Sequence, residues 1–183
     1  MILSDTKILE GIETGRIVIR PFRKECLGSN SYDVHLGDTL GQYTSYYLDA
    51  RIRNPVAFEK IPPHGYILEP ERFYLGVTEE YTETLDHVPF LEGKSSIGRL
   101  GIDIHATAGK GDVGFKNHWT LEISVKQPVR VYAGMPIGQL IYFKVDGPVA
   151  VSYDKKPGAK YLAPSSSPVE SKMWMNFPEK VVL

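Results

Sequence analysis

The sequence has a single cysteine, Cys26, among its 183 residues. One cysteine cannot form an intramolecular disulfide, and a chain without a Cys-x-x-Cys pair has no multi-cysteine zinc site. No segment approaches the roughly 20 consecutive apolar residues of a membrane-spanning helix. The first five residues lack the basic and apolar regions of a secretory signal. We therefore expect a cytoplasmic protein that neither contacts a membrane nor uses zinc.

The chain also lacks an excess of charge of either sign. Its 21 Lys and Arg residues balance 22 Asp and Glu residues, giving a net charge of −1. This balance excludes the basic surface that a nucleic acid polymer requires. A smaller anion needs only a local group of cations, which Lys94, Arg99, Lys110 and Lys160 could supply. The length and a hydrophobic content of 42% are typical of one globular domain, assigned here to residues 1–183.

One helix is expected, over residues 4–14, with Ser4 as its N-cap and Gly15 after its end. Most of the remaining chain consists of short apolar segments separated by Gly and Pro, which predicts an antiparallel sandwich or distorted barrel. We expect residues 41–65 to form an irregular edge or long loop and residues 79–86 an acidic, solvated connection. The expected strands are 17–19, 31–36, 67–69, 73–78, 129–132, 137–145 and 149–153.

Residues 119–125 alternate as a strand, with Trp119, Leu121 and Ile123 on one face and Glu122 on the other. A carboxylate on such an interior strand is costly unless it is paired or functional. Glu122 is therefore a candidate catalytic acid and base. The alternative is a scaffold role in which Glu122 pairs with Arg99.

A turn over residues 94–99 brings two hydroxyls beside a cation. Arg99 follows Ser95 by four residues and shares its face if the turn is helical. Free backbone N–H groups at the start of such a turn favour an anion such as phosphate.

The ordered motifs of the chain resemble those of the dCTP deaminase family, a branch of the dUTPase-like nucleotide enzymes. They are Lys-Ser-Ser-x-x-Arg (94–99), His-Ala-Thr-Ala (105–108), Asp112 with Gly114-Phe115, and Thr-Leu-Glu (120–122). Weaker matches are residues 28–34, residues 134–140, Tyr153 and residues 159–161. The resemblance implies an all-β, distorted β-barrel or jelly-roll of the dUTPase-like type. It also implies an N-terminal helix, one short helix, and a homotrimer with sites at subunit interfaces.

The resemblance further implies a role for each motif residue. Glu122 would move protons without a metal, while Ser95 and the Ala108 carbonyl hold the attacking water and Arg99 orients the site. Asp112 and Phe115 would contact the sugar, and Thr120 and Leu121 the base through the strand backbone. The remaining substrate-binding residues would face the phosphates: Lys94, Ser96, Tyr153, Lys160 and Tyr161. A mobile segment around residues 154–168 would close over the nucleotide, and the apolar tail 173–177 would dock on the body or on a neighbouring subunit.

The reaction so implied is deamination of dCTP to dUTP and ammonia, with Mg²⁺ arriving on the triphosphate and dTTP as a feedback inhibitor. An alternative is a bifunctional enzyme that also cleaves dUTP to dUMP and diphosphate, as Gly109 suggests. Lys110 favours deamination alone, because bifunctional relatives tend to carry a bulky apolar residue there. The family's phosphate-contacting glutamine is replaced within residues 162–165, which weakens the expected preference for a triphosphate. A non-catalytic nucleotide sensor is a further alternative.

Overall fold

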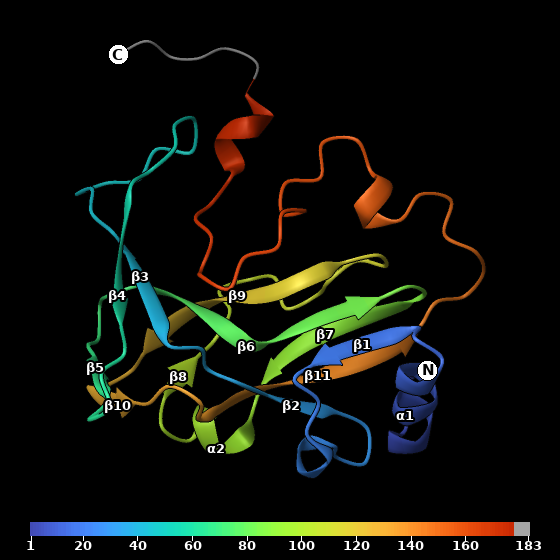
Figure 1. Ribbon diagram of the computed structural model, residues 1–183. Helices are drawn as coiled ribbons and strands as arrows, with labels where there is room; N and C mark the ends of the chain where they lie inside the picture. The colour runs from blue at the N-terminus through green and yellow to red at the C-terminus, as the bar shows by residue number, and fades with distance from the viewer. Residues whose placement is uncertain (178–183) are drawn as a thin grey trace.

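The computed structural model describes residues 1–177 and is dominated by antiparallel strands (Figure 1). Helix α1 (Asp5–Glu13) follows Ser4, as predicted, and buries Ile8 against the body. The chain leaves the helix through Gly15, whose φ of 70° is accessible to glycine at little cost. None of the helices in residues 1–177 is long and apolar enough to cross a membrane.

The strands form three antiparallel sheets. The largest has the order β4 (Val56–Lys60), β3 (Thr39–Tyr43), β6 (Tyr74–Thr84), β9 (Lys116–Val125) and β8 (Ile102–Asp103), and β1 (Ile17–Arg20) also pairs with β6. The second has the order β2 (Tyr32–His35), β11 (Pro136–Lys144) and β7 (His87–Gly93). The third pairs β10 (Val129–Val131) with β5 (Tyr66–Leu68). Short helical turns are η1 (Lys24–Cys26), α2 (Ser95–Gly98), η2 (Tyr153–Lys155) and η3 (Met173–Asn176).

The core takes its apolar residues from all three sheets, and β9 supplies a complete face. Its buried residues alternate with half-buried ones along the whole strand. Leu121 and Ile123 are fully buried, and Trp119 is 7% exposed, as the alternation predicts. The other face of β9, which carries Thr120 and Glu122, remains available for a site.

Four expectations about strands and loops were wrong or incomplete. Residues 41–65 contain the β3–β4 hairpin, because the prolines flank β4 rather than interrupt it. Residues 79–84 belong to β6 and are not a solvated connection, and β7 was not predicted. Residues 149–153 pair with no strand of the described chain and lead into η2. Residues 105–115 form an irregular loop, and β8 before it pairs with β9 over two residues.

The two regions expected to carry the chemistry lie at opposite ends of the chain's fold. Figure 1 shows α2 at one end and the C-terminal segment with η2 and η3 across the other, beyond β9. This separation determines which of the candidate residues meet within one chain.

Candidate active site

A pocket of about 770 Å³ lies along β9, beneath the C-terminal segment. Glu122 and Thr120 contribute from the strand, and Ala108 contributes from the loop that precedes it. Of the predicted site residues, the pocket brings together Glu122, Ala108, Asp112, Phe115, Thr120, Tyr153, Lys160 and Tyr161. The chain thus assembles one coherent part of the predicted site.

Glu122 is half-buried on the pocket face of β9. Its Oε2 accepts a hydrogen bond from the backbone N–H of Ala106 at 2.8 Å, and its own N–H donates to the Ile104 carbonyl at 2.9 Å. The partner of the carboxylate is thus a backbone amide. Arg99 is exposed and does not line the pocket, so the alternative of a Glu122–Arg99 scaffold pair is wrong within the chain.

Lys110 and Asp112 form an ion pair in the pocket, with Nζ and Oδ1 2.6 Å apart. The intervening loop is fixed to β7, because the Leu91 N–H donates to the Gly109 carbonyl at 2.7 Å. A Cβ at position 109 would lie 2.5 Å from the Leu91 carbonyl oxygen, so only glycine fits there. Both charged side chains are about half exposed, and water therefore weakens the pair. A bound anion can therefore replace Asp112 as the partner of Lys110 at a small cost in free energy.

Aromatic rings form one wall of the pocket. The ring centroid of Phe115 lies 4.9 Å from that of Trp119 and 6.1 Å from that of Tyr153. These rings offer an apolar surface of the size of a sugar or a base in the pocket that Glu122 also lines.

The C-terminal segment lies over β9 through hydrogen bonds to its polar face. The Val169 N–H donates to Thr120 Oγ1, and the Tyr161 N–H donates to Tyr153 Oη, both at 3.1 Å. Tyr161 Oη in turn accepts from the Lys172 N–H, and burial raises the pKa of the Tyr161 hydroxyl. The expected closing segment is therefore attached to the pocket within a single chain.

Asn117 is the residue of this region that the sequence reasoning missed. It is 3% exposed, and its Nδ2 donates to the carbonyls of Tyr161 and Ala163 at 3.3 and 3.0 Å. Its Oδ1 accepts from the Ser165 N–H at 2.9 Å. The sequence did contain a signal: the alternation of β9 directs the Asn117 amide to the same face as the apolar Trp119 and Leu121, close to the predicted Thr-Leu-Glu motif.

Asp154 secures the η2 turn at the pocket rim. It accepts a hydrogen bond from the Ser152 hydroxyl at 2.5 Å and pairs with Lys116 Nζ at 3.0 Å. The Ser152 hydrogen bond and then the Lys116 ammonium hold the pKa of the Asp154 carboxyl below its usual range. This turn positions Tyr153 opposite Phe115.

The predicted residues of the 94–99 turn do not reach this pocket. Ser95, Ser96 and Arg99 are exposed at α2, where their side chains are free to meet a partner. Lys94 forms an ion pair with Asp33, which occupies the lysine within the chain. Leu121 is expected to contact the base through its backbone, and its side chain is fully buried in the core.

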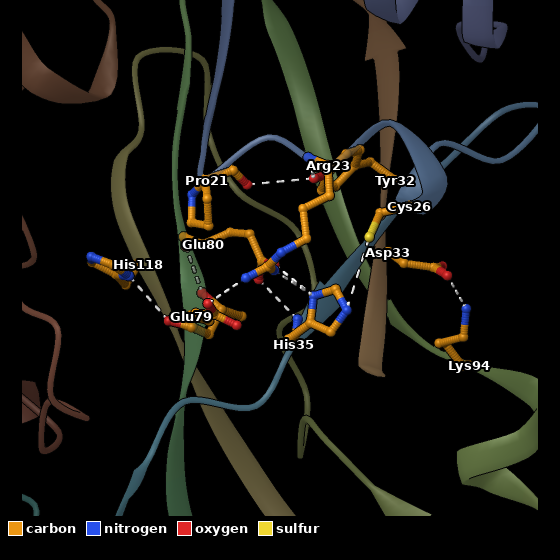
Figure 2. A network of polar contacts seen from close by, with 11 residues as sticks. Pro21, Arg23, Cys26, Tyr32, Asp33, His35, Glu79, Glu80, Lys94 and His118 are labelled. Carbon is orange, nitrogen blue, oxygen red and sulfur yellow. Dashed lines mark hydrogen bonds and ion pairs between the residues drawn. The ribbon is translucent and has the colours of Figure 1, made fainter. Parts of the chain in front are cut away.

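A second polar cluster lies inside the fold, beside the pocket strand (Figure 2). Glu80 is completely buried, and its Oε1 lies 2.6 Å from His35 Nδ1 and 3.1 Å from Arg23 Nη1. Arg23 Nη2 also pairs with Glu79 at 2.5 Å. Oxygen and nitrogen atoms of His35, Glu79 and Glu80 are close enough to hold a metal ion. The Arg23 guanidinium already supplies the positive charge among them, so we interpret the cluster as scaffold.

Cys26 joins this cluster with its Sγ 3.9 Å from His35 Nε2. Burial raises the pKa of the Cys26 thiol, and the side chain is 7% exposed. A protonated, enclosed thiol is a poor nucleophile, so the Cys-His-Glu order is not a catalytic triad.

Residues 2–145 match the dCTP deaminase-like family. The chain belongs to the dCTP deaminase family. It is 49% identical to a protein of Leptospira biflexa over 150 residues, which are 82% of this chain and 86% of that one. It is 47% identical to a protein of Clostridium acetobutylicum over 161 residues, 88% of this chain and 90% of that one. Both relatives bear the name "dCTP deaminase, dUMP-forming".

The fold agrees with this membership of the dCTP deaminase family. The crystal structure of 2′-deoxycytidine 5′-triphosphate deaminase from Agrobacterium tumefaciens has a TM-score of 0.61 to this chain at 20% identity. The match covers 77% of this chain and 47% of that one. At this identity the likeness concerns the fold alone.

Proposed function

We propose that this protein converts dCTP into dUMP, ammonia and diphosphate, consuming two molecules of water. The observation that carries the proposal is the Glu122 carboxylate, which faces the pocket of a dCTP deaminase-like chain and is bound by a backbone amide rather than a basic side chain. The names of the relatives favour this bifunctional reaction over the deamination alone that Lys110 suggested.

Deamination requires a water, a proton acceptor and a proton donor at the C4 position of cytosine. Glu122 accepts a proton as the water oxygen adds to C4 and delivers it to N3 of the ring. The same carboxylate then carries the second proton to the exocyclic amine, which leaves as ammonia while C4 becomes a carbonyl. A positioned acid and base of this kind accelerates a reaction by about 10²–10⁴. The Ala108 carbonyl, at the same pocket, would hold the water.

The backbone groups along one edge of β9 would recognise the base. The Glu122 N–H points toward β8, and alternate residues of a strand direct their backbone groups to the same side. Because β8 pairs with residues 124 and 125, the backbone of Thr120 has no partner strand on that side within residues 1–177. A pyrimidine can take its place there, as an added strand would.

Release of diphosphate needs a second water that attacks the α-phosphorus while the bond to the bridging oxygen breaks. Asp112 is the proton acceptor that we propose for this step. A triphosphate that draws Lys110 away from Asp112 leaves the carboxylate free to act. Mg²⁺ bound to the triphosphate would neutralise part of the charge on its oxygens. dTTP would fit the same pocket and act as a feedback inhibitor.

A second copy of the chain would complete the site. Ser95, Ser96 and Arg99 lie on α2, at the opposite end of the fold from the C-terminal segment (Figure 1). Their exposure leaves them free to meet a neighbouring subunit, and the family resemblance favours a homotrimer in which the 94–99 turn of one subunit meets the β9 pocket of the next. Arg99 and the two hydroxyls would then face the phosphates and the attacking water.

The test is to incubate the purified protein with dCTP and Mg²⁺ and to separate the nucleotides by ion-exchange chromatography. Equal amounts of dUMP and diphosphate, with ammonia, are expected. Accumulation of dUTP would show that the protein deaminates dCTP without cleaving the product. Binding without any product would identify the nucleotide sensor.

A further inference from the structure

His118 lines the pocket from β9 and has no role in the reaction proposed above. Its Nδ1 lies 3.0 Å from the Thr78 carbonyl oxygen. A carbonyl oxygen can only accept, so Nδ1 carries the hydrogen and donates. In the uncharged ring Nε2 is then an acceptor, and in the charged ring it is a donor. The ring thus presents one nitrogen whose role depends on its charge.

The carbonyl that orients His118 is itself fixed by the fold. Thr78 is 1% exposed and lies where the register between β6 and β9 shifts, between Val77 and Tyr81. Its hydroxyl donates to the Glu80 carbonyl and accepts from the Trp119 N–H, both at 2.9 Å. Strand irregularities of this kind often redirect a side chain beside a site.

Glu80 lies within this irregularity, and its buried carboxylate is fixed by His35 and Arg23. Figure 2 shows His118 directed away from Arg23, His35 and Glu80, with a contact to β6 at its near side. The ring of Tyr81 supports the imidazole edge to face at 5.7 Å. His118 is therefore a pre-oriented ring at the wall of a pocket, which lowers the entropic cost of using it to bind a ligand.

The position of His118 along the strand indicates which part of a nucleotide it meets. It lies four residues from Glu122 on the same face, a span of about 13 Å at the usual rise of a strand. With cytosine C4 at Glu122, that distance corresponds to the phosphate end of the nucleotide. Lys156 and Lys160 line the same pocket, so the local charge also favours an anion.

Resting on the proposed function, we propose that His118 binds the phosphates of the nucleotide through Nε2–H and takes up a proton when it does so. Phosphate oxygens only accept hydrogen bonds, so the ring must be charged in the complex. His118 is then a substrate-binding residue that couples affinity to pH: nucleotide binding weakens as pH rises.

The ligand for the test is α,β-imido-dUTP, which has no amine to lose and resists cleavage between its α- and β-phosphates. Calorimetric titrations at about pH 8 in buffers of different ionisation enthalpy give both the affinity and the number of protons taken up. The wild type should take up a fraction of a proton. His118→Asn, whose amide can still donate to Thr78, should bind about tenfold more weakly, the loss expected for one charge-assisted hydrogen bond, with less proton uptake.

Two variants separate binding from structure. His118→Gln keeps a donor near the position of Nε2 and should recover part of the affinity without the proton uptake. His64→Asn, at an exposed histidine outside the pocket, should match the wild type in both. Equal proton uptake by wild type and His118→Asn would overturn the proposal, as would equal affinity of the two for the analogue. Failure of the wild type to bind the analogue would instead refute the proposed function.

Discussion

Removal of the Asn117 amide should release the C-terminal segment from β9 while the sheets stay folded. Asn117→Ala deletes one hydrogen bond of 2.9 Å to the Ser165 N–H and one of 3.0 Å to the Ala163 carbonyl, together with a longer one of 3.3 Å. At about 1 kcal/mol each for the two shorter bonds, docking of the segment weakens by about 2 kcal/mol. The population of the undocked segment should then rise about 30-fold.

Hydrogen–deuterium exchange with mass spectrometry measures this directly. Peptides covering residues 158–172 should exchange about 30-fold faster in Asn117→Ala, with β6 and β11 unchanged. Ser124→Ala is the matched control, because its hydroxyl contacts Asp103 near the other end of the same strand, and it should exchange like the wild type. Equal protection of Ser165 in Asn117→Ala and wild type would refute the assignment of Asn117 as the anchor.

Three further predictions concern the scaffold. Glu80→Gln removes the buried carboxylate that contacts His35 and Arg23 and should lower the free energy of unfolding by about 3 kcal/mol, measured by urea denaturation; an unchanged midpoint would contradict the assigned role of the cluster. Because the folded-state pKa of Asp154 is lowered, its stabilising contribution is complete above the unfolded value of about 3.9 and disappears as pH falls through the folded value. Exchange of the η2 turn should therefore accelerate below about pH 4 in the wild type and lose this dependence in Asp154→Asn; identical pH profiles would exclude protonation of Asp154 as the cause. Gly109→Ala should lower the melting temperature, since its Cβ would meet a carbonyl at 2.5 Å, while Gly98→Ala, with nothing within 4 Å, should be tolerated; similar melting of the two would contradict the close packing.

Local patterns were sufficient to predict the elements whose signals are contained in a few residues. The N-terminal helix was predicted from Ser4 and Gly15, and the inward face of β9 from its alternation. Glu122 was predicted as the residue that contradicts the apolar setting of that strand. Such signals need no knowledge of the partner element.

Features that depend on distant partners could not be predicted. Glu80 was assigned to a solvated connection because its partners, His35 and Arg23, are 45 and 57 residues away along the chain. Residues 149–153 have the composition of a strand but find no edge to pair with. The sequence could not indicate that Asn117 anchors the C-terminal segment, because this role depends on the position of that segment over β9.

The motif order also gave no indication of which residues share a pocket. Ser95 and Glu122 are 27 positions apart, yet only Glu122 lines the pocket of the chain. Sequence proximity cannot distinguish a site within one subunit from a site between two.

The rate of ammonia formation by the Glu122→Gln variant tests the central claim most directly. The amide keeps the size of the side chain and can still accept from the Ala106 N–H, but it cannot take a proton from water. With dCTP and Mg²⁺, formation of ammonia should fall by at least about 100-fold, while the affinity for α,β-imido-dUTP stays within a few-fold of the wild type. Ammonia release at the wild-type rate by a folded Glu122→Gln protein would contradict the account.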